Sequence, residues 1–222
     1  MSFRRRIKYY LVHSLNYTNK GADKLLASGA LSINGKIVLQ NEILKDEDEL
    51  KSGEEVIKKP MAYTYYALNK PIGIESTFNK NIKDNLSTVF PFDERYSVAG
   101  RLDKASEGLL LISDDGKWIR EITRPENRKE KEYEVEVNKS IDESFVRSMS
   151  EGLDIGICVT QPCFVEKTGD KNFKIILTEG KNKQIRRMCK KLGFLVLKLK
   201  RTRIDKFYLS DLQNNNYKLT TI

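Results

Sequence analysis

The sequence has few of the residues on which metal sites and histidine-dependent catalysis depend. Its 222 residues include one histidine, His13, and three cysteines, Cys158, Cys163 and Cys189. A structural zinc site or a histidine-based catalytic triad needs more of them. Three cysteines cannot all pair, and no secretory leader with an apolar core precedes them, which is typical of a reducing cytoplasm. We therefore expect a cytoplasmic protein that uses neither a metal nor another cofactor.

Long apolar runs are absent as well, so a membrane protein is not expected. No run approaches the roughly 20 apolar residues that span a bilayer. The chain has instead an excess of positive charge, with 40 Lys and Arg against 31 Asp and Glu. Such a chain attracts polyanions, which makes nucleic acid the first candidate partner. A basic surface that only maintains solubility would have the same composition.

A small N-terminal domain is predicted over residues 1–60, beginning with two helices. Apolar residues recur at helical spacing over residues 7–15, with basic residues on the other face. Thr18 or Asn19 can cap a second helix, and Gly29 can end it in a left-handed conformation. Two short helices are therefore expected first.

A hairpin is predicted after these helices. Leu31-Ser32-Ile33 and Lys36-Ile37-Val38 flank Asn34-Gly35, the dipeptide that best accepts the positive dihedral angles of a tight turn. Lys58-Lys59-Pro60 is typical of a linker. This order of elements resembles the S4-like RNA-binding domain, first described in a ribosomal small-subunit protein. The resemblance implies that basic side chains of this domain bind RNA, and the candidates are Arg4, Arg5, Arg6, Lys8 and Lys36.

Residues 61–222 predict a larger α+β domain. Strands are predicted at residues 65–68, 108–112, 133–137, 157–166 and 173–178. Ser140 and Glu143 have the spacing of a capping box at the start of a helix. Asn182 can cap a second, strongly basic helix that Gly193 can end. Asp114 and Asp115 precede a glycine and predict a polar turn.

One glycine-bounded segment has the composition of a catalytic loop. Gly100-Arg101-Leu102-Asp103-Lys104 places a carboxylate between two cations directly before an apolar strand. Nearby positive charge would favour the ionised carboxylate. Loops at the ends of strands commonly carry catalytic groups, although a surface ion pair would show the same spacing.

This segment, continued by Ser106-Glu107-Gly108-Leu109-Leu110-Leu111, resembles the signature of the RNA pseudouridine synthases. Three further motifs of that family occur along the chain in the family's order. One lies before this segment, Leu68-Asn69-Lys70-Pro71-Ile72-Gly73, and two lie after it, Lys131-Glu132-Tyr133 and the run from Thr178 through Gln184-Ile185-Arg186 to Met188. With the N-terminal domain they resemble the ribosomal branch of the family, most closely the F-type synthases that modify large-subunit RNA. The resemblance implies a catalytic domain with a central mixed, mainly antiparallel sheet.

The resemblance also assigns roles to single residues. Asp103 corresponds to the catalytic aspartate, Tyr133 to the tyrosine that stacks on the base, and Arg186 to the arginine that pairs with the aspartate. The remaining candidates for RNA binding are Arg101, Lys183, Arg187 and Lys190. The expected substrate is ribosomal RNA, with large-subunit RNA preferred and transfer RNA left open. Nothing in the sequence requires a dimer, so we expect a monomer.

The implied reaction needs only one ionised carboxylate. The bond from ribose to the base nitrogen breaks, the uracil turns over, and its carbon 5 joins the same sugar carbon. Asp103 could attack the sugar as a nucleophile or remove a proton from ribose carbon 2, and the sequence leaves both open. Two alternatives also remain, an inactive RNA-binding or ribosome-assembly factor and a metal-dependent nuclease that uses Asp114 and Asp115.

Overall fold

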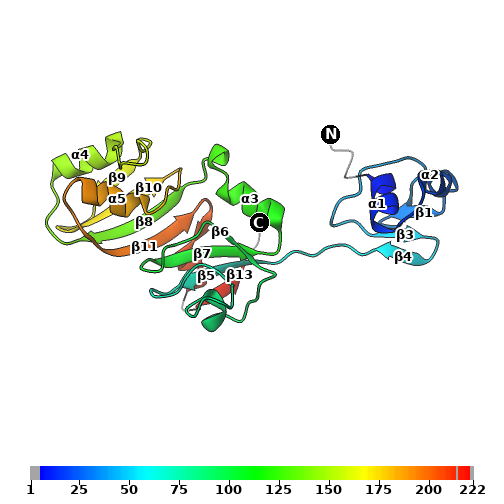
Figure 1. Cartoon of the computed structure of the whole chain (residues 1–222), viewed down its shortest axis with the longest axis horizontal. Helices are drawn as coiled ribbons and strands as arrows, with labels where there is room; N and C mark the ends of the chain where they lie inside the picture. Colours follow the sequence, from blue (N-terminus) through cyan, green and yellow to red (C-terminus); the bar gives the residue numbers. More distant parts are fainter. Residues whose placement is uncertain (1–5, 214, 221–222) are drawn as a thin grey trace. The chain divides into compact units, whose positions relative to one another are not determined.

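The computed structural model describes residues 6–213 and 215–220 (Figure 1). The chain divides into two compact units, Met1–Ala62 and Tyr63–Ile222. No helix in the described ranges is long and apolar enough to cross a bilayer. Each unit has its own hydrophobic core, so we describe them separately.

The described part of the first unit, from residue 6 to residue 62, contains two helices and a four-stranded sheet of order β2-β1-β3-β4. Its elements are α1 (Ile7–Ser14), α2 (Asn19–Ala27), β1 (Leu31–Ile33), β2 (Lys36–Ile37), β3 (Leu50–Ser52) and β4 (Glu55–Lys58). Thr18 caps α2, because its hydroxyl accepts a hydrogen bond of 3.0 Å from the amide of Gly21. Asn34 and Gly35 have φ angles of 50° and 82° in the hairpin turn. The predicted helices, cap and hairpin are therefore confirmed.

The second unit is built on a nine-stranded mixed sheet with a central path β13-β5-β7-β11-β8-β10-β9. Its strands are β5 (Tyr65–Lys70), β6 (Ser97–Ala99), β7 (Glu107–Ser113), β8 (Lys131–Val137), β9 (Phe164–Lys167), β10 (Asn172–Leu177), β11 (Val196–Ile204), β12 (Phe207–Tyr208) and β13 (Tyr217–Leu219). β7 and β11 run parallel, whereas the other strand pairs are antiparallel. The predicted mixed, mainly antiparallel sheet is confirmed.

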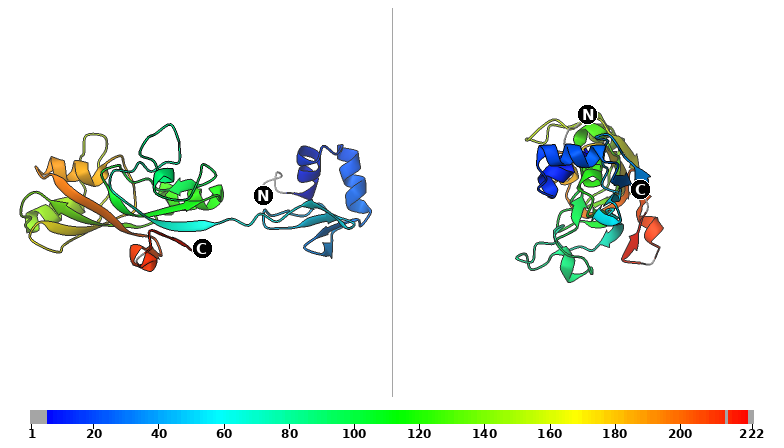
Figure 2. Two further views of the ribbon diagram at one scale, coloured as in Figure 1. Left: turned by 90° about the horizontal axis from the view of Figure 1, so that it is seen from below. Right: turned by 90° about the vertical axis from the view of Figure 1, so that its right-hand side faces the viewer.

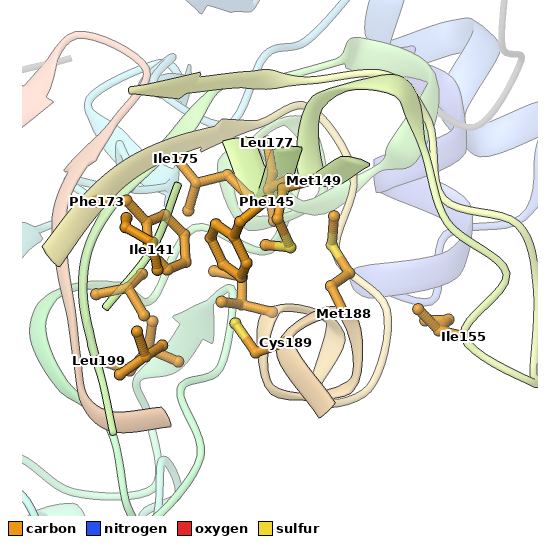
Figure 3. Packing of buried hydrophobic residues seen from close by; sticks show 13 residues of the cluster. Ile141, Phe145, Met149, Ile155, Phe173, Ile175, Leu177, Met188, Cys189 and Leu199 are labelled. Atoms are coloured by element: carbon orange, nitrogen blue, oxygen red, sulfur yellow. The ribbon is translucent and has the colours of Figure 1, made fainter. Parts of the chain in front are cut away.

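Helices cover parts of both faces of this sheet. They are α3 (Gly116–Thr123), α4 (Glu143–Glu151) and α5 (Gln184–Lys191), with the short 3₁₀ helices η2 (Leu86–Thr88), η3 (Pro125–Asn127) and η4 (Leu209–Leu212). α4 and α5 pack on β8, β10 and β11 through a buried cluster that Figure 3 shows. In Figure 2, left, α5 (orange) and η4 (red) lie on opposite sides of the sheet.

The alternation of β5 and β7 divides their apolar residues between the two faces. Leu68, Leu110 and Ile112 pack under residues 71–96, on the same face as α4 and α5. Leu109 and Leu111 pack on the other face with α3, β12 and η4. Two separate segments thus cover the face that carries α4 and α5. Residues 71–96 lie over β5 and β7, and the two helices lie over β8, β10 and β11.

Several predicted boundaries were wrong. Asp142, not Ser140, caps α4, because its carboxylate accepts from the amide of Phe145 at 2.8 Å. Lys183 precedes α5 with φ 50°, so Asn182 is not the cap. The strand predicted at 157–166 begins only at Phe164. The turn predicted at Asp114 and Asp115 is the start of α3, a helix that the sequence analysis missed.

Candidate active site

A row of paired residues crosses the middle of the sheet in the second unit. Lys70 of β5 pairs with Gly108 of β7, Gly108 with Arg201 of β11, and Arg201 with Tyr133 of β8. Directly paired residues point to the same face of a sheet. The side chains of Lys70, Arg201 and Tyr133 therefore point to the face that carries α4 and α5, between those helices and residues 71–96.

Glycine at position 108 is required by the close approach of β11. Its φ is +104°, and a Cβ built there would lie 2.3 Å from the carbonyl oxygen of Arg201. Arg201 itself is only 1% exposed. Its Nε donates to the carbonyl of Leu109 at 2.8 Å and its Nη2 to the carbonyl of Gly100 at 2.7 Å. This buried arginine therefore ties β7 to the loop that carries Asp103.

The loop at residues 100–106 is fixed from several sides. The hydroxyl of Ser76, which is buried, donates to the carbonyl of Leu102 at 2.7 Å and accepts from its amide at 3.0 Å. The amide of Gly73 donates to the carbonyl of Lys104 at 2.8 Å. Because these contacts hold the backbone on both sides of Asp103, its carboxylate is pre-positioned by the fold.

Asp103 is half-buried and lines a cavity of about 840 Å³ beside this loop. Within the described part of the chain its carboxylate forms no hydrogen bond or ion pair. The neighbouring Lys104 also lines the cavity, but its ammonium pairs with Asp84 at 2.8 Å. Of the two flanking cations, only Arg101 lines the cavity without such a partner among the described residues.

Arg186 lies in the same cavity but does not pair with Asp103. Its Nη2 donates to the carbonyl of Ala105 at 2.8 Å, and its Nη1 to the carbonyl of Val196 at 3.2 Å. Its Nε is buried and has no partner among the described residues. The ion pair implied by the family resemblance is therefore not formed here. Arg186 instead joins α5 to the loop that carries Asp103 and retains one donor without a partner among the described residues.

The wall opposite this loop is formed by residues 178–184. The buried carboxylate of Glu179 accepts from the Gln184 side chain at 2.7 Å and from the Gln161 amide at 2.9 Å. The Gln184 oxygen accepts in turn from the amide of Lys181 at 3.0 Å. These bonds fix the entry to α5, and with it the position of Arg186.

Part of the cavity lining is apolar, and part of it is cationic. Leu177, Ile185 and Leu199 line it together with Tyr133. Tyr133 is half-buried, and its hydroxyl forms no hydrogen bond within the described ranges. Burial lowers the pKa of Lys131, which also lines the cavity, and the charge of Arg201 lowers it further. The ring of Tyr133 thus lines a cavity that has more cationic than acidic side chains, the acidic ones being Glu75, Asp103 and Glu179.

Lys70 is fully buried at the edge of this site. Its ammonium donates to the carbonyls of Pro71 and Ile74 at 2.8 and 2.7 Å. Burial lowers its pKa from 10.5 to about 8, although the charges of Glu75 and Asp103 act in the opposite direction. The folded protein therefore releases a proton that the unfolded chain still binds between about pH 8 and pH 10.5.

We predict that wild-type stability rises with pH relative to Lys70→Met. Below about pH 8 the buried charge is fully present and costs stability, and this cost disappears as the pH rises toward 10.5. The difference in unfolding free energy between the two proteins should shift in favour of the wild type by up to about 1.4 kcal/mol per pH unit. Urea denaturation at pH 7, 8, 9 and 10 measures it, and parallel curves would show that Lys70 does not titrate in this range.

The predicted RNA-binding residues are distributed over both units. Arg4 and Arg5 lie outside the described residues. In the first unit, Lys8 pairs with Asp23 at 2.7 Å, Arg6 donates to the carbonyl of Asn41, and Lys36 is exposed on β2.

In the second unit the candidates lie on the loop that carries Asp103 and around α5. Arg101 and Lys183 line the cavity, and Lys190 is exposed on α5. Arg187 is half-buried and donates to the carbonyl of Asn182 at 3.0 Å. Three of the four predicted cations in the second unit are therefore exposed to solvent, and these are Arg101, Lys183 and Lys190.

Asp114 and Asp115 have structural roles. The Asp115 carboxylate caps α3 by accepting from the amides of Lys117 and Trp118. Asp114 accepts from the amide of Thr64 at 2.8 Å. Neither lines the cavity, and the described ranges contain no cluster of three or more His, Cys, Asp or Glu side chains suited to a metal ion.

The sequence analysis missed the supporting residues of the site. It gave no role to Arg201, Ser76, Glu179 or Gln184, although all four are nearly or fully buried polar side chains. Charged residues are seldom fully buried without a specific partner. Nothing in the local sequence marks Ser76 or Arg201 as buried, because their partners lie between 26 and 101 positions away along the chain. Only their place within or next to the family motifs was a signal.

Comparison with known proteins agrees with this geometry. Residues 64–191 match the model of the RNA pseudouridylate synthase family. The chain is 38% identical over 207 residues to the dual-specificity RNA pseudouridine synthase RluF of Escherichia coli K12, covering 92% of this chain and 71% of RluF. It is 34% identical to an RNA pseudouridine synthase of Aquifex aeolicus, covering 93% and 88% of the two chains.

A solved structure also covers both units. The crystal structure of a pseudouridylate synthase superposes with a TM-score of 0.67 at 29% identity, covering 97% of this chain and 96% of the other. The matched family segment, 64–191, includes Tyr133, Arg186 and the loop that carries Asp103. The chain therefore belongs to the RNA pseudouridylate synthase family, resembles its RluF-type members, and is an enzyme that isomerises uridine in RNA.

Proposed function

We propose that this enzyme converts a specific uridine of ribosomal RNA, in the large subunit, to pseudouridine with Asp103 as its catalytic carboxylate. The observation that supports this most directly is the placement of Asp103. It projects from a loop held by Ser76, Gly73 and Arg201 into a cavity that it shares with Tyr133 and Arg186. A carboxylate held in this way needs no reorganisation before it meets the sugar.

In the proposed reaction Asp103 acts on the ribose while the protein holds the detached uracil. The bond between the sugar carbon and the base nitrogen breaks, and a new bond forms from the same sugar carbon to carbon 5 of the base. The hydrogen at carbon 5 leaves as a proton, and the freed base nitrogen takes up a proton, so that no atoms are gained or lost overall. Asp103 promotes cleavage either as a nucleophile or as a base, and the cations in the cavity offset the negative charge that develops on the uracil.

We propose two roles for the Arg186 side chain. It holds the catalytic loop through the carbonyl of Ala105, and its buried Nε is left as a donor for a charged group in the cavity. An unpaired buried donor is costly, so a partner that arrives with the substrate or with a shift of Asp103 would be favoured. Arg186 therefore acts on Asp103 through the loop in the free enzyme and by direct pairing in the RNA complex.

Tyr133 is proposed as the platform for the extruded base, and substitution separates its ring from its hydroxyl. We predict that Tyr133→Ala lowers kcat/KM by about 10- to 100-fold, because base stacking contributes about 1 to 3 kcal/mol. Tyr133→Phe should lose much less, because the hydroxyl has no hydrogen-bond partner within the described chain. Steady-state rates of tritium release from RNA labelled at uridine carbon 5 measure both. Equal losses would contradict a stacking role.

We further propose that the first unit is an S4-like domain that docks on RNA. Its support is the order of two helices and a hairpin, with Lys36 exposed in the hairpin. Phosphate contacts from such a domain position an RNA without reading its bases, so local shape and exposure of the uridine select the target. The enzyme is proposed to act in the cytoplasm as a monomer.

The choice of RNA is tested with unmodified transcripts of large-subunit RNA, small-subunit RNA and transfer RNAs. One relative is named a dual-specificity enzyme, so the enzyme is assayed with more than one class of RNA. Carbodiimide treatment and primer extension locate each new pseudouridine. We expect one site in large-subunit RNA with unchanged RNA length in the presence of a chelator. Modification only in small-subunit or transfer RNA would refute the proposed target, and shortened RNA would favour the nuclease alternative.

A further inference from the structure

A short turn between α3 and β8 lies at the mouth of the active-site cavity. It comprises residues 124–128, contains η3, and is called the η3 turn below. Thr123 and Pro125, on either side of Arg124, line the cavity together with Lys131 just beyond the turn. The η3 turn therefore lies along the path by which a nucleotide and its neighbours reach Asp103.

The η3 turn is held in one conformation by bonds within it and on both sides. The Asn127 side chain donates to the carbonyl of Glu121 at 2.7 Å, and the amide of Arg128 to the carbonyl of Pro125 at 3.1 Å. Arg128 has a φ of 48°, which is uncommon for a residue other than glycine. Such a conformation persists only where its surroundings impose it.

The residues that follow are held by ion pairs to Arg203 in β11 and to Asp205 directly after that strand. Lys129 pairs with Asp205 at 2.8 Å, and Glu130 with Arg203 at 2.8 Å. The amide of Asp205 also donates to the carbonyl of Glu130 at 2.8 Å. The base of the η3 turn is therefore anchored, while its tip extends into solvent.

The two arginines of this turn have no carboxylate partner among the described residues. Arg124 and Arg128 are exposed and, within the described ranges, have neither an ion pair nor a side-chain hydrogen bond. Lys129, Arg203 and Lys104 nearby in sequence or space each have a carboxylate partner. Glu126 is the only acidic residue of the turn and is also exposed. The η3 turn thus presents two free guanidinium groups on a rigid support.

We propose that the η3 turn binds backbone phosphates of the RNA strand next to the uridine that enters the cavity. This inference rests on the proposed function in taking RNA as the polyanion. Guanidinium groups match phosphate oxygens with two parallel hydrogen bonds, and a pre-formed support limits the entropy lost on binding. With Lys183 on the wall near α5, the two arginines give the strand cationic contacts on two sides of the cavity.

The test is a double variant of the full chain, Arg124→Gln/Arg128→Gln, with a matched control, Arg147→Gln. Arg147 is exposed on α4 and does not line the cavity, and its side chain has no partner among the described residues. Binding of a fluorescein-labelled RNA hairpin is measured at several salt concentrations. Tritium release from large-subunit transcripts labelled at uridine carbon 5 gives kcat and KM, and thermal unfolding verifies that both variants are folded.

The double variant should bind the hairpin about 10- to 100-fold more weakly, with a log–log salt slope shallower by about 1.5, because two phosphate contacts are lost. Its kcat at saturating RNA should stay within about threefold, while Arg147→Gln changes neither quantity. Glu126→Gln should tighten binding. Affinity and slope equal to those of the control would overturn the proposal, as would a loss confined to kcat. A wild-type enzyme without activity would refute the proposed function, and the hairpin data would still decide this inference.

Discussion

Asp103→Asn is expected to lower kcat by about 10³-fold or more while binding of RNA stays within a few-fold of wild type. The amide keeps the size of the side chain but cannot act as a nucleophile or accept a proton. Because the Asp103 side chain forms no hydrogen bond or ion pair in the described chain, its replacement removes no structural contact. Thermal unfolding should therefore be unchanged.

This prediction is measured by single-turnover tritium release and by binding of a labelled RNA hairpin to the same protein preparation. Asp114→Asn is the matched control, because that carboxylate lies outside the cavity and accepts from the amide of Thr64. It should keep its rate even if it loses some stability. A rate for Asp103→Asn near that of wild type would remove Asp103 from the mechanism.

Gly108→Ala is expected to cost about 4 kcal/mol of folding stability, the largest effect on stability that we predict. An added Cβ would lie 2.3 Å from the carbonyl oxygen of Arg201 and 2.8 Å from its amide nitrogen, and alanine is also strained at a φ of +104°. Relief of the clash would separate β11 from β7 at their parallel pairing. Overpacking of this kind contributes about 1 to 3 kcal/mol, and the left-handed conformation contributes about 1 to 2 kcal/mol.

Gly156→Ala separates the two contributions. Gly156 has a similar φ of +85°, but nothing lies within 4 Å of the position that its Cβ would take. This control should lose only the conformational cost, about 1 to 2 kcal/mol. Urea denaturation and the soluble yield of both variants provide the comparison. If the two alanines cost the same, β11 does not approach β7 as closely as described.

Local signals in the sequence predicted much of the fold. Thr18 is a strong helix cap, Asn34-Gly35 favours a tight hairpin, and alternation marks β8, so each of these elements was found from neighbouring residues alone. Where two good candidates lay close together, local reasoning chose wrongly, as with Ser140 and Asp142 at α4. α3 was missed because Asp-Asp-Gly is equally typical of a turn.

The candidate site was predictable in its residues but not in its contacts. The family motifs named Asp103, Tyr133 and Arg186, and the fold brings all three to one cavity. The partner of Arg186 could not be derived, because it bonds Ala105 from 81 positions away. The burial of Arg201 depends on the parallel pairing of β7 with β11 and on the absence of a side chain at Gly108. Such non-local packing leaves no periodic pattern in the sequence.

The central claim, that Asp103 of this enzyme isomerises one uridine of ribosomal RNA, is tested most directly in cells. Pseudouridine is mapped by carbodiimide and primer extension in ribosomal and transfer RNA from three strains, which carry the wild-type protein, no protein, or Asp103→Asn. We predict that one large-subunit site is present in the first strain and missing from the other two. A pattern of sites that is identical in all three strains would contradict the claim and favour a role in RNA binding without catalysis.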